Sequence, residues 1–301
     1  MKNQEVINIL TQYSAEYGSN CFWNKGLIES QLSASEWGIT NQKCSETHCT
    51  SNKFGNAIQC YGYSLFVAYV IFGDKLWYNT IESAADGTAL TGGWKIFKSN
   101  LSSVTIEPGD IIRTNGHSAM VHNVNSDGTF TVTECWGSKD YGCPIKWGNF
   151  NGRTANKYIS TVLSAAIYVL KAPKTYKIKN VGSNKYLSVM SGTAYNEARV
   201  IQLTSNSTDS QKWLTNSYFG QEKIITALDH DLSIKYDESS TDIHCRIYNT
   251  SENVCLVNSG SYRKIQSADG SQFLSADASG SNVYWTSGDS TAYQKWSFEE
   301  V

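Results

Sequence analysis

The chain has 301 residues, enough for two ordinary domains, and 40% of them are hydrophobic, as in a globular protein with a full core. Its net charge is -2 and no run of Lys or Arg is present, which excludes an electrostatic grip on nucleic acid. No apolar run approaches the roughly 20 residues that cross a bilayer, so we expect no membrane span.

Residues 1–20 are predicted to form an amphipathic helix, with Val6, Ile9, Leu10 and Tyr13 at helical spacing. This segment lacks the apolar h-region of a signal peptide. The eight cysteines nevertheless favour an oxidising destination. We therefore expect a secreted or extracellular protein whose signal peptide is absent from this sequence, or one exported without a signal.

Six of the cysteines form closely spaced couples, which are Cys44 with Cys49, Cys135 with Cys143, and Cys245 with Cys255. Spacing does not define disulfide pairing, and Cys21 has no obvious mate. An alternative is a zinc site formed by Cys21, Cys44, His48 and Cys49, whose side chains are chemically able to bind the metal. Because this spacing matches no common structural zinc site, we expect no metal and no cofactor.

A short apolar helix is predicted to open at Gln59 and to run to about Phe72, because Tyr63, Phe66, Val67, Val70 and Ile71 recur at helical spacing. Gly73 follows where a left-handed C-terminal cap belongs. The preceding residues 51–56 are polar and turn-prone, so Cys60 lies in the first helical turn. The unpaired backbone N–H groups and the positive end of the helix dipole there favour the thiolate over the thiol.

A β-hairpin is predicted downstream of residues 107–110, a turn that leads into the strand 111–114. The hairpin strands are 117–124 and 130–136, joined by the turn 125–128. If Val124 pairs with Thr129, Ala119 lies opposite Glu134. One face then carries the apolar residues together with His117 and Glu134, and His122 lies on the other. A three-residue loop with a bulge would reverse this parity.

Cys60, His117 and Glu134 are the residue types of a nucleophilic triad, in which a base takes the thiol proton and an acid orients the base. The Cys60 backbone N–H is a candidate oxyanion donor, with Asn56 or Gln59 as candidates for the second. The alternative is structural, with a small core cysteine and a histidine satisfied by its neighbours. A metal hydrolase is disfavoured, because the sequence has no His-Glu-x-x-His motif.

Four motifs occur in a characteristic order, and together they resemble the CHAP and NlpC/P60 cysteine peptidase superfamily. They are Asn56-Ala57-Ile58-Gln59-Cys60-Tyr61-Gly62-Tyr63, Pro108-Gly109-Asp110-Ile111-Ile112, Gly116-His117-Ser118-Ala119-Met120-Val121 and Thr133-Glu134-Cys135-Trp136. The resemblance covers about residues 1–170. It implies a papain-like α+β fold, with helices packed on an antiparallel sheet, and cleavage of an amide bond in peptidoglycan.

By this resemblance Cys60 is the nucleophile, His117 the base and Glu134 the orienting acid. The sequence departs from the family in one respect, because many members carry Asn two residues after the acid. Here that position is Trp136, and Asn149 or Asn151 would have to take its role.

After residue 172 the pattern changes to short strands separated by Ser, Asn, Asp and Gly turns, and we place a domain boundary between residues 172 and 173. Tyr-Leu-Ser-Val at 186–189, Asp-Leu-Ser-Ile at 231–234 and Phe-Leu-Ser-Ala at 273–276 recur at intervals of 45 and 42 residues. Gln-Lys-Trp occurs at 211–213 and again at 294–296. Three such units, none able to bury its own apolar residues, predict a closed three-fold barrel.

These repeats resemble the ricin-B-type β-trefoil lectins with their Gln-x-Trp motifs, over about residues 174–301. In the middle repeat, a constant interval along the sequence makes Ile243 equivalent to Val200 and Val283. That repeat lacks the Gln and the Trp. The sugar-gripping Asp of that family is replaced by Ser188, Ser233 and Ser275. The aromatic position corresponds to Ile201, His244 and Tyr284, so the third unit is the candidate carbohydrate site, with Asp277, Tyr284, Trp285 and Gln294. The alternative is a trefoil that serves as a spacer or binds protein.

The sequence therefore predicts a papain-like cysteine hydrolase domain at residues 1–172 and a β-trefoil at 173–301. We expect a peptidoglycan hydrolase, either an N-acetylmuramoyl-L-alanine amidase or an endopeptidase of the stem peptide or cross-bridge, that docks on surface glycan. The alternative is a lectin-type toxin or adhesin whose first domain is inactive or cleaves host proteins.

Overall fold

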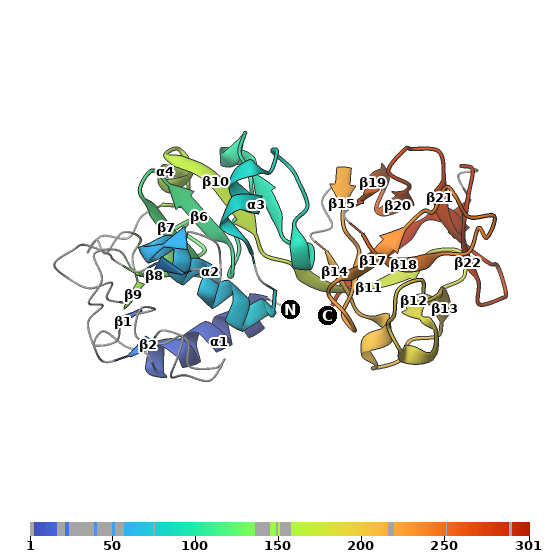
Figure 1. Ribbon diagram of the computed structural model, residues 1–301, viewed down its shortest axis with the longest axis horizontal. Helices are drawn as coiled ribbons and strands as arrows, with labels where there is room; N and C mark the ends of the chain where they lie inside the picture. The colour runs from blue at the N-terminus through green and yellow to red at the C-terminus, as the bar shows by residue number, and fades with distance from the viewer. Residues whose placement is uncertain are drawn as a thin grey trace. The chain divides into compact units, whose positions relative to one another are not determined.

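The computed structural model describes residues 3–16, 22–23, 39–40, 50–51, 57–74, 76–135, 145–148, 150, 158–215, 220–250, 252–288 and 291–301. These residues form two compact units (Figure 1). The first unit comprises residues 3–87 and 95–172, and the second comprises residues 88–94 and 173–301. No helix in the described ranges is long and apolar enough to cross a membrane.

The first unit is built on a six-stranded antiparallel sheet with the strand order β5-β10-β6-β7-β8-β9. Its strands are β5 (Lys95–Phe97), β6 (Ile111–Thr114), β7 (His117–Val124), β8 (Phe130–Cys135), β9 (Ile145–Gly148) and β10 (Ala166–Lys171). Two further pairs join β1 (Phe22–Trp23) to β2 (Ile39–Thr40) and β3 (Thr50–Ser51) to β4 (Ala57–Ile58). This unit is therefore mostly sheet, with few helices.

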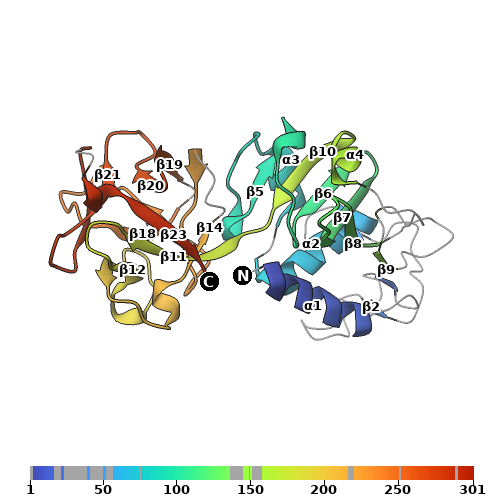
Figure 2. The same cartoon turned by 180° about the vertical axis from the view of Figure 1, so that it is seen from behind.

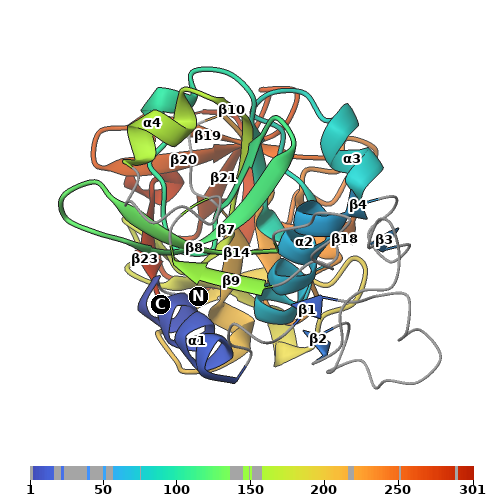
Figure 3. The ribbon, with the colours of Figure 1, turned by 90° about the vertical axis from the view of Figure 1, so that its left-hand side faces the viewer.

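Four α-helices accompany this sheet among the described residues, and α2 lies against β7 and β8 (Figure 3). They are α1 (Asn3–Glu16), α2 (Gln59–Phe72), α3 (Tyr78–Ser83) and α4 (Ile159–Leu163), with a 3-10 turn η3 at Leu101–Ser103. The two predicted helices are confirmed. In α1 the buried residues are Val6 and Leu10, and Gly73 ends α2 in the left-handed region with φ +81°.

The strand pairing between β7 and β8 differs from the predicted register next to the turn and matches it farther along the strands. Val124 pairs with Phe130 rather than with Thr129, and a bulge at His122 then shifts the register by one residue. From Val121 opposite Val132 onward the pairing is the predicted one. The expected apolar face therefore forms, with Ala119, Val121, Phe130 and Val132 in one buried cluster.

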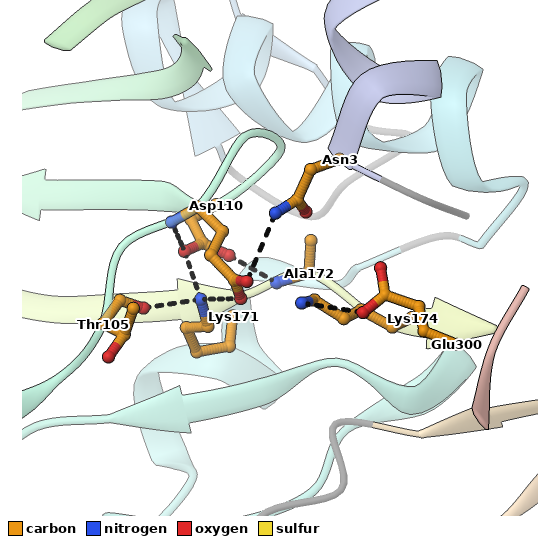
Figure 4. A network of polar contacts seen from close by, with 8 residues as sticks. Asn3, Thr105, Asp110, Lys171, Ala172, Lys174 and Glu300 are labelled. Carbon is orange, nitrogen blue, oxygen red and sulfur yellow. Dashed lines mark hydrogen bonds and ion pairs between the residues drawn. The ribbon is translucent and has the colours of Figure 1, made fainter. Parts of the chain in front are cut away.

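A buried ionic network holds the start of β6 against the end of β10 (Figure 4). Lys171 and Asp110 are each 1% exposed, and their Nζ and Oδ2 atoms lie 2.5 Å apart. Lys171 also donates to the Thr105 carbonyl at 2.7 Å and to Glu107 Oε2 at 3.0 Å. The other Asp110 oxygen accepts the Ala172 backbone N–H at 2.9 Å. These bonds satisfy both buried charges, which otherwise carry a large desolvation cost.

The second unit is the predicted all-β trefoil, with thirteen strands in the described ranges. Its strands are β11 (Lys174–Asn180), β12 (Tyr186–Val189), β13 (Val200–Leu203), β14 (Trp213–Thr215), β15 (Gly220–Glu222), β16 (Ile225–Thr226), β17 (Leu232–Lys235), β18 (Arg246–Asn249), β19 (Val254–Ser259), β20 (Tyr262–Gln266), β21 (Phe273–Ala276), β22 (Val283–Thr286) and β23 (Trp296–Glu300). Short 3-10 turns are η2 (Thr91–Gly93), η5 (Met190–Gly192), η6 (Asp209–Gln211) and η7 (Ala292–Gln294). The ring of strands closes where β23 pairs with β11 (Figure 2).

Both Gln-x-Trp motifs, in the first and third repeats of the trefoil, have structural roles. The indole N–H of Trp213 donates to the Leu187 carbonyl at 3.2 Å, and that of Trp296 donates to the Leu274 carbonyl at 3.0 Å. Gln211 donates to the carbonyl of Thr204, seven residues earlier, and Gln294 makes the same bond to Ser287. Each glutamine therefore ties down a loop, and each tryptophan fills the core.

The middle repeat of the trefoil does not follow the predicted alignment, in which Ile243 corresponds to Val200 and Val283. Val254 pairs with Glu222 as Trp213 pairs with Tyr176, so Val254 occupies the place of the missing Trp. The hairpin partner of Ile234 is Ile247, whereas Ile243 is 53% exposed. The hairpin of this unit is therefore longer than the other two, which a count at a constant interval does not detect.

Residues 88–94 belong to the second unit, although in sequence they lie within the first domain. At Gly93, φ is +79°, and a Cβ atom there would come within 3.2 Å of the Pro173 Cβ and 3.3 Å of the Leu214 carbonyl carbon. Only glycine combines this backbone conformation with so close an approach.

Candidate active site

Three elements of the first unit supply the residues of the candidate site. Cys60 lies in the first turn of α2, His117 opens β7, and Glu134 is the penultimate residue of β8. The side chain of Glu134 is fully buried and that of His117 is 12% exposed. Cys60 is 5% exposed and is a free thiol.

The structure brings these three side chains together. His117 Nε2 lies 2.6 Å from Glu134 Oε2, and the Cys60 thiol forms a side-chain hydrogen bond with the same ring. Because Glu134 engages Nε2, the nitrogen left for the thiol is Nδ1. The Phe150 ring packs edge-on against the imidazole at a centroid distance of 5.2 Å and limits its rotation.

These contacts shift the ionisation of the cysteine and the histidine in opposite directions. Burial opposes the thiolate, but the hydrogen bond and charge of His117 outweigh it, with smaller contributions from the Ser118 N–H and Arg113, and the pKa of Cys60 is lowered. Burial also opposes the imidazolium, but hydrogen bonds to Cys60 and Glu134 raise the pKa of His117 to about 9. The two contacts therefore favour the thiolate of Cys60 together with the imidazolium of His117.

Helix α2 is held to the sheet by a buried bond close to the site. Tyr63, one turn after Cys60, places its hydroxyl 2.8 Å from Thr133 Oγ1. Thr133 directly precedes Glu134, so this contact helps to set the position of Cys60 relative to the strand that carries Glu134.

Two contacts at the candidate site were not expected from the sequence. The backbone N–H of Ser118 donates to the Cys60 sulfur, and Arg113 Nη1 donates to Ser118 Oγ at 3.0 Å. Arg113 and Ser118 are paired across β6 and β7. Side chains alternate along a strand, so both lie on the face of the sheet opposite to His117. Their position near Cys60 was therefore not predictable from the sequence pattern.

Several predicted positions lie outside the described residues. They are Cys21, Cys44, His48 and Cys49 of the zinc alternative, Cys143, Asn56, Trp136, Asn149 and Asn151, and the side chain of Gln59. Of the cysteine couples, the one formed by Cys245 and Cys255 is described. Cys245 is a free thiol buried in the trefoil core, so the two do not form a disulfide.

The four candidate carbohydrate-binding residues of the third trefoil repeat differ in their exposure to solvent. Trp285 is 3% exposed within the core cluster and Gln294 is fully buried, so neither presents its side chain to a ligand. This corrects the expectation, and the reason is strand alternation, which turns Trp285 inward with Val283. Asp277 and Tyr284 remain partly exposed, and Asp277 accepts a hydrogen bond from Asn282 at 2.8 Å.

The serines at the family's sugar-gripping position are also buried. Ser188, Ser233 and Ser275 are each at most 2% exposed. They therefore do not replace the acid that grips sugar hydroxyls in the family that the repeats resemble.

Comparison with known families and structures bears on the second unit. Residues 166–261 match the family model described as a ricin-type β-trefoil lectin domain-like domain. Over these residues the second unit is therefore similar to the ricin-type β-trefoil lectin domain. This match includes the first two trefoil repeats. A search of curated proteins found no match.

Solved structures that resemble this chain include a designed three-fold symmetric protein, ThreeFoil, at 24% identity and a TM-score of 0.38, covering 42% of this chain and 99% of that one. The Rhizoctonia solani agglutinin has 20% identity and a TM-score of 0.36, covering 42% and 95%. The C-half of an earthworm R-type lectin, solved in complex with GalNAc, has 16% identity and a TM-score of 0.34, covering 42% and 99%.

Proposed function

We propose that the first unit is a cysteine-dependent amidohydrolase. The observation that carries this proposal is the hydrogen-bonded series in which a free thiol, an imidazole and a buried carboxylate follow one another. A carboxylate with no exposed surface, bonded at 2.6 Å to a histidine, keeps the ring in one orientation and stabilises its charge.

In the proposed reaction the Cys60 thiolate attacks the amide carbonyl carbon. The resulting oxyanion is stabilised by backbone N–H groups at the start of α2, that of Cys60 among them. The His117 imidazolium gives its proton to the leaving amine, which departs and leaves a thioester. His117 then removes a proton from water, the hydroxide attacks the thioester carbonyl, and the carboxylic acid is released with the thiolate restored.

Peptidoglycan is the proposed substrate, and the motifs that resemble CHAP and NlpC/P60 peptidases support it. The bond would be the N-acetylmuramoyl-L-alanine amide or an amide of the stem peptide or cross-bridge. The trefoil would dock on surface glycan, and the partly exposed Asp277 and Tyr284 are its candidate contacts. Tethering raises the concentration of catalyst at a polymer, so a weak lectin suffices.

The test compares wild-type protein with Cys60→Ser on purified cell walls. We expect clearing to be lost, because a hydroxyl lacks the reactivity of a thiolate, while retention on a glycan column is unchanged. Cys245→Ala is the matched control, since it removes a buried thiol far in sequence from the triad and should keep clearing. Mass spectrometry of the released muropeptides identifies the bond. Undiminished clearing by Cys60→Ser would refute the proposal.

The second candidate is a lectin-type toxin or adhesin, which the lectin-type trefoil match favours equally. It predicts retention on glycan without clearing by the wild-type protein, together with cleavage of host protein or no cleavage at all.

A further inference from the structure

Arg113 is a cation beside the candidate triad, and most of its N–H donors have no partner in the described ranges. Its Nη1 donates to Ser118 Oγ at 3.0 Å, and its guanidinium carbon lies 4.9 Å from the centroid of the Tyr61 ring. Within the described part of the chain it makes no ion pair. A guanidinium has five N–H donors, so most of them bind no other described residue. The side chain is half-buried, which weakens competition from bulk water.

The two residues that Arg113 contacts are the immediate neighbours of the nucleophile and the base. Tyr61 follows Cys60, and Ser118 follows His117. The Ser118 backbone N–H also donates to the Cys60 sulfur. The guanidinium is close enough to act on the thiol through its charge, so a group bound to it would lie next to the reacting bond.

The nearby acidic groups are engaged elsewhere. Glu134 binds His117 at 2.6 Å, and Glu82 accepts a hydrogen bond from the Tyr168 hydroxyl at 2.9 Å. Neither forms an ion pair with Arg113. A cation that has no carboxylate partner among the described residues, and that lies beside a candidate nucleophile, is suited to a carboxylate that arrives with the substrate. The planar fork of arginine matches a carboxylate with two parallel hydrogen bonds.

We propose that Arg113 binds a carboxylate of the substrate adjacent to the scissile amide and thereby selects substrates with a free carboxyl group. This inference rests on the proposed hydrolase function. Substrates whose carboxyl group is free should be cleaved faster than those in which the same group is a carboxamide, because the neutral amide loses the charge-assisted bond.

The test uses two alkylating reagents that differ only in charge at the relevant group. Iodoacetate carries a carboxylate and iodoacetamide carries a neutral amide. Their rates on Cys60 are measured in the full chain and divided by their rates on free glutathione. We expect the corrected iodoacetate-to-iodoacetamide ratio to be about tenfold higher in wild type than in Arg113→Gln, where the His117 imidazolium is the cation that remains beside the thiol.

Arg113→Lys is the conservative variant, and it should keep part of the preference as a point charge without the bidentate geometry. A change in thiol reactivity alone would slow both reagents equally and leave the ratio unchanged. An equal ratio in wild type and Arg113→Gln would therefore overturn the inference.

A second measurement does not depend on the nucleophile. In Cys60→Ser, the Nε–H resonance of Arg113 should shift on titration with N-acetyl-alanine and stay in place with N-acetyl-alaninamide. Absence of a carboxylate-specific shift would also overturn the inference. Failure of the wild-type protein to clear cell walls, by contrast, would reject the proposed function without changing either anion readout.

Discussion

At the scale of single residues, the site depends on where two protons reside. The imidazole of His117 is bonded to a carboxylate on one side and to a thiol on the other, and both contacts favour its charged form. The thiol, in turn, is ionised most easily while that charge is present. The protonation states of Cys60 and His117 therefore depend on each other.

The pH profile follows from these shifts. The pKa of His117 is raised to about 9, so the imidazolium is present below that pH and is lost as the pH rises through it. The pKa of Cys60 is lowered, so the thiolate persists below its ordinary range. We expect kcat/KM for hydrolysis to be bell-shaped, with an alkaline limb near pH 9.

Glu134→Gln should move that alkaline limb to lower pH, because removal of the negative charge destabilises the imidazolium, and should lower kcat by about 10²- to 10⁴-fold. His122→Asn is the control, since His122 is on the same strand but bonds Thr11 at 3.1 Å. An alkaline limb that stays in place in Glu134→Gln would show that the carboxylate does not set the histidine pKa.

At the scale of elements, two features position the strands that carry the triad. The bulge at His122 restores the register that the turn had shifted, so that His117 and Glu134 reach the same side. The buried pair of Lys171 and Asp110 joins β10 to the start of β6, the strand that carries Arg113. The register of three neighbouring strands thus depends on a few local contacts.

Lys171→Met should destabilise the first unit by about 3–5 kcal/mol, because it leaves the Asp110 carboxylate buried without its cation. Lys98→Met in the same unit is the control. Lys98 is partly exposed and makes a solvent-exposed hydrogen bond to the Glu82 carbonyl, so its replacement should cost about 0.5 kcal/mol or less. The measurement is the free energy of unfolding from denaturant titration. Equal effects of the two substitutions would mean that the ionic network contributes little.

At the scale of the whole molecule, each unit has its own core, and one short segment is not where its sequence position suggests. Residues 88–94 belong with the trefoil unit, although the chain enters them from α3 and leaves them into β5 of the first unit. The close approach of Gly93 to Pro173 and Leu214 depends on the absence of a side chain.

Gly93→Ala should destabilise the trefoil unit by about 2–4 kcal/mol, since it combines the cost of a left-handed residue with contacts near 3.2 Å. Gly192→Ala separates the backbone cost from the cost of the close contacts. Gly192 has φ +67° with nothing within 4 Å of its added Cβ, so only the backbone cost of about 1–2 kcal/mol applies. If the two variants unfold at the same denaturant concentration, the segment does not pack as described.

Local patterns in the sequence were sufficient to determine α1, α2 with its glycine cap, the strands β6 to β8 and the three-fold repeat of the trefoil. These features depend on spacing and turn chemistry that neighbouring residues encode. The tertiary structure alone decided which groups surround Cys60, because Arg113 and Ser118 reach it through strand pairing. It also decided that Trp285 and Gln294 are buried, and that residues 88–94 join the trefoil, because packing between distant segments leaves no periodic signal in the chain.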